Sequence, residues 1–220
     1  MHMVKMIPPA AAGEAPDHPV AGPVCCGAGK RRIAGRPQDL PGGGARRRDH
    51  LRNARAGIEK RRQHLDVVVA IVDTHGGKEA EGLLRQLEVI PGRASGPAPS
   101  RRATPGCAGE MDLDAVLRRR PALALVDEFA HINAPGSLHP RRFMEVCELL
   151  QAGIDVYATL HMHQVESLNA IVARITRVQR GEVIPDSLVY RADEIEVIEA
   201  APWDIARRLR RGKLALWFAA

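Results

Sequence analysis

Two adjacent acidic residues, Asp127 and Glu128, stand directly after the apolar run 123–126. In nucleotide-binding proteins with a phosphate loop, an aspartate at the end of a buried strand helps to hold Mg²⁺, and a neighbouring residue can orient the attacking water. We therefore expect Asp127 to bind Mg²⁺ through a nucleotide and Glu128, the candidate catalytic residue, to position water. A strand that ends in a solvated acidic turn would contain the same residues, so both interpretations stay open.

The next segment, 129–142, concentrates polar groups and turn-forming residues at the carboxyl end of the same predicted strand. Ligands bind at that end of the strands in open α/β sheets. Five side chains in this segment could contact a nucleotide or its phosphates: His131, Asn133, Ser137, Arg141 and Arg142. Taken singly, each of them also suits a Pro-Gly turn followed by the solvated start of a helix.

Polar residues follow two other predicted strands as well. Asp73-Thr74-His75-Gly76 comes after one apolar run, and His161-Met162-His163-Gln164 comes after another. The carboxyl ends of parallel strands meet at one edge of a sheet, so we expect Asp127, His75 and His161 to share one rim. His161 and His163 stand two residues apart and could in principle hold a metal. No third ligand stands at a metal-binding spacing, and we interpret both as polar loop residues.

A nucleotide site also needs backbone N–H groups that hold phosphate, commonly in the pattern G-x-x-x-x-G-K-[ST] between a strand and a helix. The best match is Val24–Arg31, which contains Gly27, Gly29 and Lys30 but has Val at its first position and Arg at the hydroxyl position. Prolines and glycines on both sides disfavour the flanking strand and helix. If a nucleotide binds, we expect Gly27, Gly29 and Lys30 to hold its phosphates. A chance match in glycine-rich, basic sequence is the alternative.

The composition sets broad limits on function. The chain has 220 residues, of which 45% are hydrophobic and 26% are charged, as in ordinary globular proteins. Its net charge of +6 comes from residues 1–65, which hold 13 Lys and Arg against 5 Asp and Glu, so we expect no nucleic-acid partner for the fold itself. No apolar stretch approaches the roughly 20 residues of a membrane span, and no signal peptide is visible. The four cysteines form neither a disulfide framework nor a zinc spacing, which favours a cytoplasmic location.

Strand and helix patterns alternate through most of the chain. Strands are predicted at 66–72, 122–126, 155–160 and 194–199, and helices at 78–87, 113–120, 141–152, 165–178 and 203–211. Asp112 is the expected N-cap of the second helix. In the fourth helix, the residues expected to face inward are Leu168, Ile171, Val172 and Ile175. This alternation predicts an α/β fold, with a mostly parallel sheet covered by helices on both faces.

Two stretches rich in glycine and proline interrupt the pattern. We interpret 1–57 as an irregular region that contains the degenerate phosphate loop, and 91–109 as a long loop, because such sequence buries too little apolar surface to offset chain entropy. The folded domain is then expected over 58–213, followed by a divergent tail at 214–220.

Several runs resemble the N-terminal cytoplasmic domain of the KdpD family, osmosensitive sensor histidine kinases that control potassium uptake. The most specific run reads L-V-D-E-F-A-H-I-N-A-P-G-S from Leu125 to Ser137. The segment 66–79 matches the strand and D/E-T-H-G-R segment of the family, with Gly77 in place of its arginine. The resemblance covers about 66–90 and 110–213.

The resemblance implies a P-loop NTPase-like domain that binds ATP and Mg²⁺ and regulates a distant kinase core, within a parent protein anchored in the inner membrane. In this alignment Gly27, Gly29 and Lys30 fall on the phosphate loop of the family, Pro23 falls on its first glycine and Arg31 on its threonine. The expected partners are the remainder of a sensor kinase or its response-regulator pathway.

No phosphoacceptor-histidine helix and no glycine-rich ATP lid follow residue 213, so we expect that this chain does not autophosphorylate alone. Two alternatives to an ATP-binding sensor domain stay open. One is a vestigial fragment, from a frame-shifted or truncated gene, that no longer binds nucleotide. The other is a small active P-loop NTPase.

Overall fold

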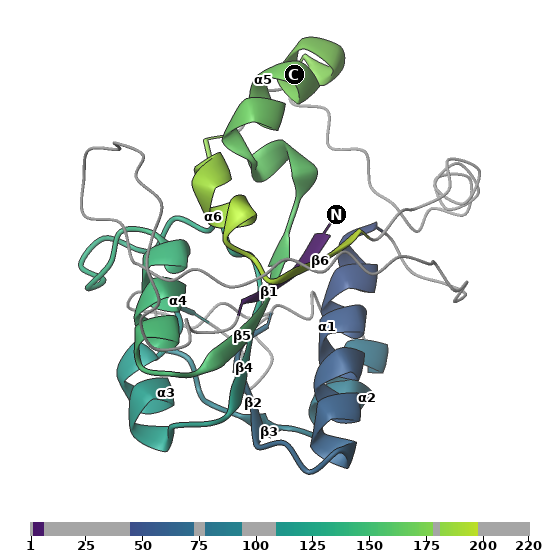
Figure 1. Cartoon of the computed structure of the whole chain (residues 1–220), viewed down its shortest axis with the longest axis vertical. Coiled ribbons are helices and arrows are strands. Elements are labelled where there is room, and N and C mark those ends of the chain that lie inside the picture. Colours follow the sequence, from purple (N-terminus) through teal and green to yellow (C-terminus); the bar gives the residue numbers. More distant parts are fainter. Residues whose placement is uncertain (1, 7–44, 73–77, 94–108, 178–180, 198–220) are drawn as a thin grey trace, which may run out of the picture.

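The computed structural model describes residues 2–6, 45–72, 78–93, 109–177 and 181–197, which form a six-stranded sheet in the order β3-β2-β4-β5-β1-β6 (Figure 1). The strands are β1 (His2–Met6), β2 (Val67–Ile71), β3 (Glu88–Val89), β4 (Leu123–Val126), β5 (Asp155–Leu160) and β6 (Glu194–Val197). Strands β3, β2, β4 and β5 pair in parallel, and β1 is antiparallel to both β5 and β6. This arrangement confirms the predicted mostly parallel sheet.

The central strands are apolar along their whole length because both of their faces are covered. All five residues of β2 and all four of β4 are buried. A parallel sheet between two layers of helices requires such continuous apolar runs. Successive side chains still point to opposite faces, since Leu123 and Leu125 belong to one hydrophobic cluster while Ala124 and Val126 belong to the other.

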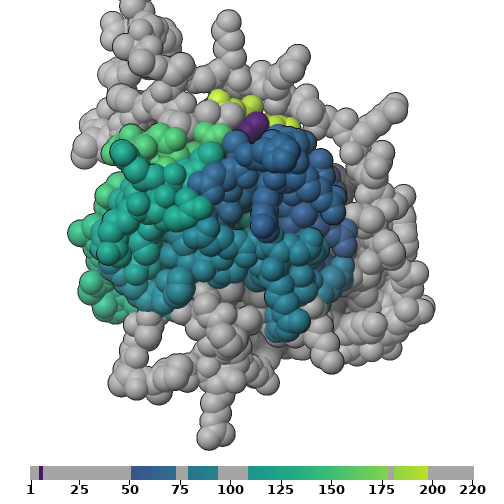
Figure 2. Space-filling model, turned by 90° about the horizontal axis from the view of Figure 1, so that it is seen from below, coloured from purple at the N-terminus to yellow at the C-terminus, as the bar shows by residue number. Residues whose placement is uncertain are grey.

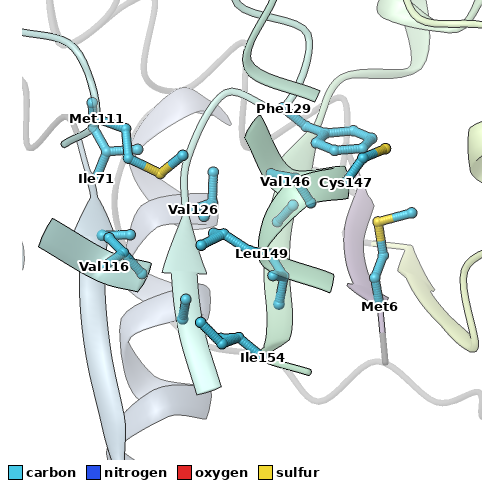
Figure 3. Packing of buried hydrophobic residues seen from close by; sticks show 14 of the residues in the cluster. Met6, Ile71, Met111, Val116, Val126, Phe129, Val146, Cys147, Leu149 and Ile154 are labelled. Carbon is cyan, nitrogen blue, oxygen red and sulfur yellow. The ribbon is translucent and has the colours of Figure 1, made fainter. Parts of the chain in front are cut away.

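Helices lie on both faces of the sheet, as predicted (Figure 1). α1 (Ala45–Arg62) and α2 (Lys78–Leu84) cover one face, and α3 (Leu113–Arg119) and α4 (Arg142–Gln151) cover the other. Under α3 and α4, Val116, Val146 and Leu149 pack with the strands in the larger hydrophobic cluster (Figure 3). Seen from below, the segments coloured blue and teal form one continuous surface (Figure 2). One hydrophobic cluster on each face therefore holds the layers together.

Capping residues fix the ends of the helices that flank β4. Asp112 precedes α3, and its Oδ1 accepts a hydrogen bond from the backbone N–H of Ala115 at 3.0 Å, which confirms the predicted N-cap. Gly153 follows α4 with a φ of +83°, a left-handed conformation that glycine adopts without a Cβ penalty. The chain then enters β5 at Asp155, directly beside β4.

One strand and the greater part of one helix lie within 1–57, for which the sequence predicts mostly irregular structure. β1 forms at His2–Met6, and α1 begins at Ala45. α1 is rich in arginine, yet its residues Leu51, Ala54 and Ile58 are buried. This sparse stripe, at spacings of three and four residues, is obscured by the glycine-rich sequence before it. Residues 7–44, which contain the candidate phosphate loop, lie outside the described residues.

Two helices differ from their predictions. α2 ends at Leu84, three residues before the predicted end, and the short edge strand β3 follows in a stretch between the predicted helix and the predicted loop where the sequence predicts no strand. α5 (Glu166–Thr176) contains no buried residue, and Ile171 and Ile175 are 54% and 77% exposed, so the predicted inward stripe is wrong at both positions. A helical period identifies an apolar face but does not identify what covers that face. The predicted helix 203–211 lies outside the described residues.

Three shorter elements complete the described chain. The 3-10 helix η1 (Met162–Gln164) follows β5, α6 (Asp186–Tyr190) follows α5, and β6 forms one edge of the sheet, as its alternating sequence predicts. Among the described helices, none is both long enough and apolar enough to cross a lipid bilayer.

Close packing of α1 on β4 gives the first testable prediction. A Cβ at Gly57 would lie 2.5 Å from Cδ1 of the fully buried Leu125. We expect Gly57→Ala to lower the free energy of unfolding, because the cost of overpacking a filled core, about 1–3 kcal/mol, outweighs the gain of up to about 1 kcal/mol in helix propensity. The control is Gly82→Ala in α2, where a Cβ meets nothing within 4 Å and better helix propensity should add up to about 1 kcal/mol. Urea unfolding measures both variants, and effects of the same sign would contradict this packing.

Candidate functional site

The buried carboxylate of Asp127 lies at the carboxyl end of β4, where the sequence predicts it. β4 and β5 run in parallel with Val126 opposite Ala158, so Asp127 and Thr159 come next on neighbouring strands. Both residues are 1% exposed. The Thr159 hydroxyl donates a hydrogen bond to Oδ1 of Asp127, and the Asp127 backbone N–H donates to the carbonyl of Ile71 in β2 at 2.9 Å. Asp127 is therefore anchored to both strands that flank β4.

Glu128 turns the chain sharply away from the sheet. Its φ of +51° lies in the left-handed region, which is uncommon for a residue with a side chain. Its backbone N–H donates to Oγ1 of Thr159 at 3.0 Å, and the N–H of Phe129 donates to the Thr159 carbonyl at 2.9 Å. The ring of Phe129 is then fully buried in the larger hydrophobic cluster (Figure 3). We call residues 127–129 the acidic turn.

The side chain of Glu128 is partly exposed and faces His131. Oε2 of Glu128 lies 3.9 Å from Nδ1 of His131, and Oε1 of Glu182 lies 3.8 Å from the same nitrogen. On the other side of the ring, Nε2 lies 3.3 Å from Oε1 of Glu110. His131 thus lies among three carboxylates that come from three separate segments of the chain.

Glu110 organises the loop between β4 and α4. Its side chain is 12% exposed and accepts hydrogen bonds from the backbone N–H of Ala134 at 3.0 Å and from Arg142 at 3.4 Å. The guanidinium of Arg142, itself buried, also donates to the backbone carbonyl of Asp127 at 3.0 Å. Sequence analysis suggested Arg142 as a phosphate contact, and the structure instead gives it internal contacts that support the acidic turn.

Asn133 is buried and closes the same loop. Its Nδ2 donates to the carbonyl of His139 at 3.0 Å, and its backbone N–H donates to the carbonyl of Pro140 at 3.1 Å. An isolated bridge between Ile132 and Arg141 continues this pairing. The turn-forming residues 134–138 are therefore held as a small hairpin-like loop, in which Asn133 has a structural part.

Asp127 and His161 follow the carboxyl ends of the paired parallel strands β4 and β5, so they lie at the same edge of the sheet, as predicted. His161 follows Leu160, the last residue of β5, and its backbone N–H donates to Oε1 of Gln164 at 2.9 Å. Its ring stacks on that of His163 with centroids 5.1 Å apart. Among the described residues, no group of three His, Cys, Asp or Glu side chains is arranged to hold a metal ion. His75, Gly27, Gly29 and Lys30 lie outside them.

Sequence reasoning missed Thr159 and Glu110. Thr159 stands within the strand V-Y-A-T-L, where a hydroxyl could be noticed only as a polar residue at a strand end. Glu110 follows a glycine-rich stretch and belongs to no motif, so its contacts arise only from the tertiary fold.

Comparison with known proteins identifies the family of this domain. The family model described as the KdpD osmosensitive K⁺ channel His kinase sensor domain matches residues 43–217. The chain belongs to this family. It is 44% identical over 155 residues to the sensor protein KdpD of Escherichia coli K12, and 42% identical over 149 residues to that of Mycobacterium tuberculosis H37Rv. It is also 39% identical over 158 residues to the putative sensor protein KdpD of Synechocystis.

The chain spans less than half the length of each of these relatives. The three alignments cover 70%, 68% and 72% of this chain, but 17%, 17% and 41% of the respective relatives. The match to the KdpD family begins at residue 43, close to the start of α1 at Ala45. It therefore includes the acidic turn and its loop and excludes Gly27, Gly29 and Lys30.

The buried residue Glu145 of α4 gives a prediction about how the stability of the fold depends on pH. Burial raises the pKa of Glu145, and the opposing effects of Asn133 and Arg142 do not cancel that increase. Because the pKa of Glu145 is higher in the folded chain than in the unfolded chain, the fold favours its protonated form. The stabilisation is complete below the unfolded-state pKa and is lost as the pH rises through the folded-state pKa, whereas neutral glutamine does not titrate. Glu145→Gln should therefore be more stable than the parent chain at pH 7, with a difference that shrinks towards pH 4.

Thermal unfolding of both proteins between pH 4 and pH 8 tests this prediction. Glu148→Gln on the same helix is the control. The Glu148 side chain is 38% exposed and lies 2.7 Å from His139, so replacing it should not stabilise the chain at pH 7. A difference in melting temperature between Glu145→Gln and the parent that stays constant with pH would show that Glu145 carries no such penalty.

Proposed function

We propose that this chain is a regulatory sensor domain of a two-component histidine kinase that controls potassium uptake, and that its ligand is ATP with Mg²⁺. Membership of the KdpD sensor domain family supports the first part. The buried Asp127 at the carboxyl end of a central parallel strand supports the second, because ligands bind at this edge of open α/β sheets. In this proposal the rest of a sensor kinase, or its response-regulator pathway, is the partner.

The residues at the edge suit Mg²⁺ bound together with a nucleotide. Mg²⁺ prefers oxygen ligands and is usually held by one or two carboxylates together with substrate phosphates and water. Asp127 offers one such carboxylate, already oriented by the Thr159 hydroxyl. Glu128, whose side chain is 33% exposed, is available to orient water beside it. Lys30, with the backbone of Gly27 and Gly29, would hold the phosphates, and bound Mg²⁺ would neutralise their charge.

His131 and Asn133 have more limited parts in this proposal. Nε2 of His131 lies against Glu110, so its ring would reach a nucleotide only at an exposed edge. Asn133 is buried and bonds to the carbonyl of His139. We propose that both act mainly by shaping the loop beside the nucleotide.

A second candidate function is a regulatory domain that binds no nucleotide. The direction of β1 favours it, because Met6 at the carboxyl end of β1 pairs with Val156 near the start of β5. The chain therefore leaves β1 at the edge of the sheet opposite to Asp127. A phosphate loop needs the preceding strand to deliver it to the carboxyl edge. Pro23 and Arg31 favour the same alternative, because they stand where the phosphate loop of the KdpD family has its first glycine and its threonine.

Titration of the purified chain with ATP, with and without Mg²⁺, separates these candidates. We expect Lys30→Ala to weaken ATP binding at least about tenfold in both conditions, a loss of about 1.4 kcal/mol. Asp127→Asn should remove the gain in affinity that Mg²⁺ provides and leave binding without metal unchanged. The controls are Lys60→Ala and Asp114→Asn, which lie on α1 and α3. Absence of binding at millimolar ATP with Mg²⁺ would support the second candidate.

A further inference from the structure

The Thr159 hydroxyl joins the two acidic residues of the candidate site. It donates its single hydrogen to Oδ1 of Asp127 and accepts the backbone N–H of Glu128 at 3.0 Å. A hydroxyl has one donor and two acceptor positions, so one side chain can satisfy both groups at once. Because Thr159 and Asp127 are 1% exposed, solvent does not compete with these bonds.

Thr159 also fixes the direction of the chain at Glu128. The hydroxyl holds the N–H of Glu128, and the backbone carbonyl of Thr159 holds the N–H of Phe129 at 2.9 Å. These two bonds keep Glu128 at a φ of +51°, a conformation that residues with a side chain adopt when the surroundings impose it. The direction of the Glu128 side chain, towards His131, follows from that backbone.

We infer that Thr159 is the positioning residue of this site: its hydroxyl sets the rotation of the Asp127 carboxylate and the left-handed turn at Glu128 together. A hydrogen bond to Oδ1 restrains the rotation of the planar carboxylate about its Cβ–Cγ bond, and would thereby help to orient the carboxylate for a cation. The inference rests on the proposed binding of ATP with Mg²⁺ at this edge. Thr159 should therefore affect the gain in ATP affinity that Mg²⁺ provides, and should not affect ATP affinity in the absence of Mg²⁺.

Two substitutions separate the hydroxyl from the shape of the side chain. Thr159→Val keeps the branched shape and removes the hydroxyl, whereas Thr159→Ser keeps the hydroxyl and removes a methyl group. Thr159→Val would leave the Glu128 N–H without its acceptor and the Asp127 carboxylate without this donor. Thr159→Ser would preserve both bonds, so rescue by serine is specific to the hydroxyl.

The main measurement is the ratio of ATP affinities with Mg²⁺ and with EDTA, determined by titration calorimetry on the 220-residue chain. We expect Thr159→Val to reduce this ratio at least about tenfold, with affinity in EDTA unchanged, and Thr159→Ser to stay within about threefold of the parent. A general loss of structure would lower both affinities and would leave their ratio unchanged. An unchanged ratio in a Thr159→Val protein that keeps the parent's affinity in EDTA would overturn the inference, and so would equal reductions of the ratio in Thr159→Val and Thr159→Ser.

Amide hydrogen exchange at Glu128 provides a readout that does not require ATP. In Thr159→Val the Glu128 N–H should exchange at least about tenfold faster than in the parent, while Thr159→Ser should remain protected. A parent chain that binds no ATP in either condition would refute the proposed function. The exchange rates would still test whether the Thr159 hydroxyl fixes the backbone at Glu128. Equal protection of the Glu128 N–H in the parent, Thr159→Val and Thr159→Ser would overturn this structural part of the inference.

Discussion

The parallel register between β4 and β5 is the constraint on which the candidate site depends. With Val126 opposite Ala158, the next residues on the two strands are Asp127 and Thr159, and a hydroxyl meets a buried carboxylate. Side chains alternate along a strand, so a slip of one residue would turn Thr159 to the other face. Such a slip would be costly, because every side chain of the slipped strand would then pack against the opposite helical layer, whose shape it does not fit. The hydrophobic layers therefore position the polar groups.

Burying Asp127 and Arg142 at one end of β4 would be unfavourable without partners, because both groups lose their hydration. The fold supplies these partners from distant segments: Thr159 bonds to the Asp127 carboxylate, and Glu110 bonds to Arg142. Arg142 also bonds to the Asp127 carbonyl, so a buried cation lies close to the acidic turn. The loop and the strand end thus form one connected network, in which loss of one partner removes a hydrogen bond from another buried group.

Local signals were enough to predict most of the fold. The apolar runs of β2 and β4 and the Asp112 N-cap all depend on neighbouring residues, and the structure confirms them. What failed depends on tertiary packing. The exposure of Ile171 and Ile175 depends on what packs against α5, and the side-chain hydrogen bonds of Glu110 are with residues between 21 and 32 positions away along the chain. At the candidate site, sequence predicts the position of Asp127 but not its hydroxyl partner, since Thr159 lies 32 residues away along the chain.

The N-terminal region shows that completing the sheet and holding phosphate are separate requirements. β5 needs a partner strand for its backbone groups, and antiparallel pairing satisfies them as fully as parallel pairing does. β1 meets that need with the five residues His2–Met6. Phosphate binding needs more, because a loop must leave the strand at the same edge as Asp127, and β1 runs in the opposite direction. The match to the KdpD family also begins only at residue 43. The sheet, the acidic turn and its supporting network can therefore persist whether or not the segment containing Lys30 completes a phosphate site.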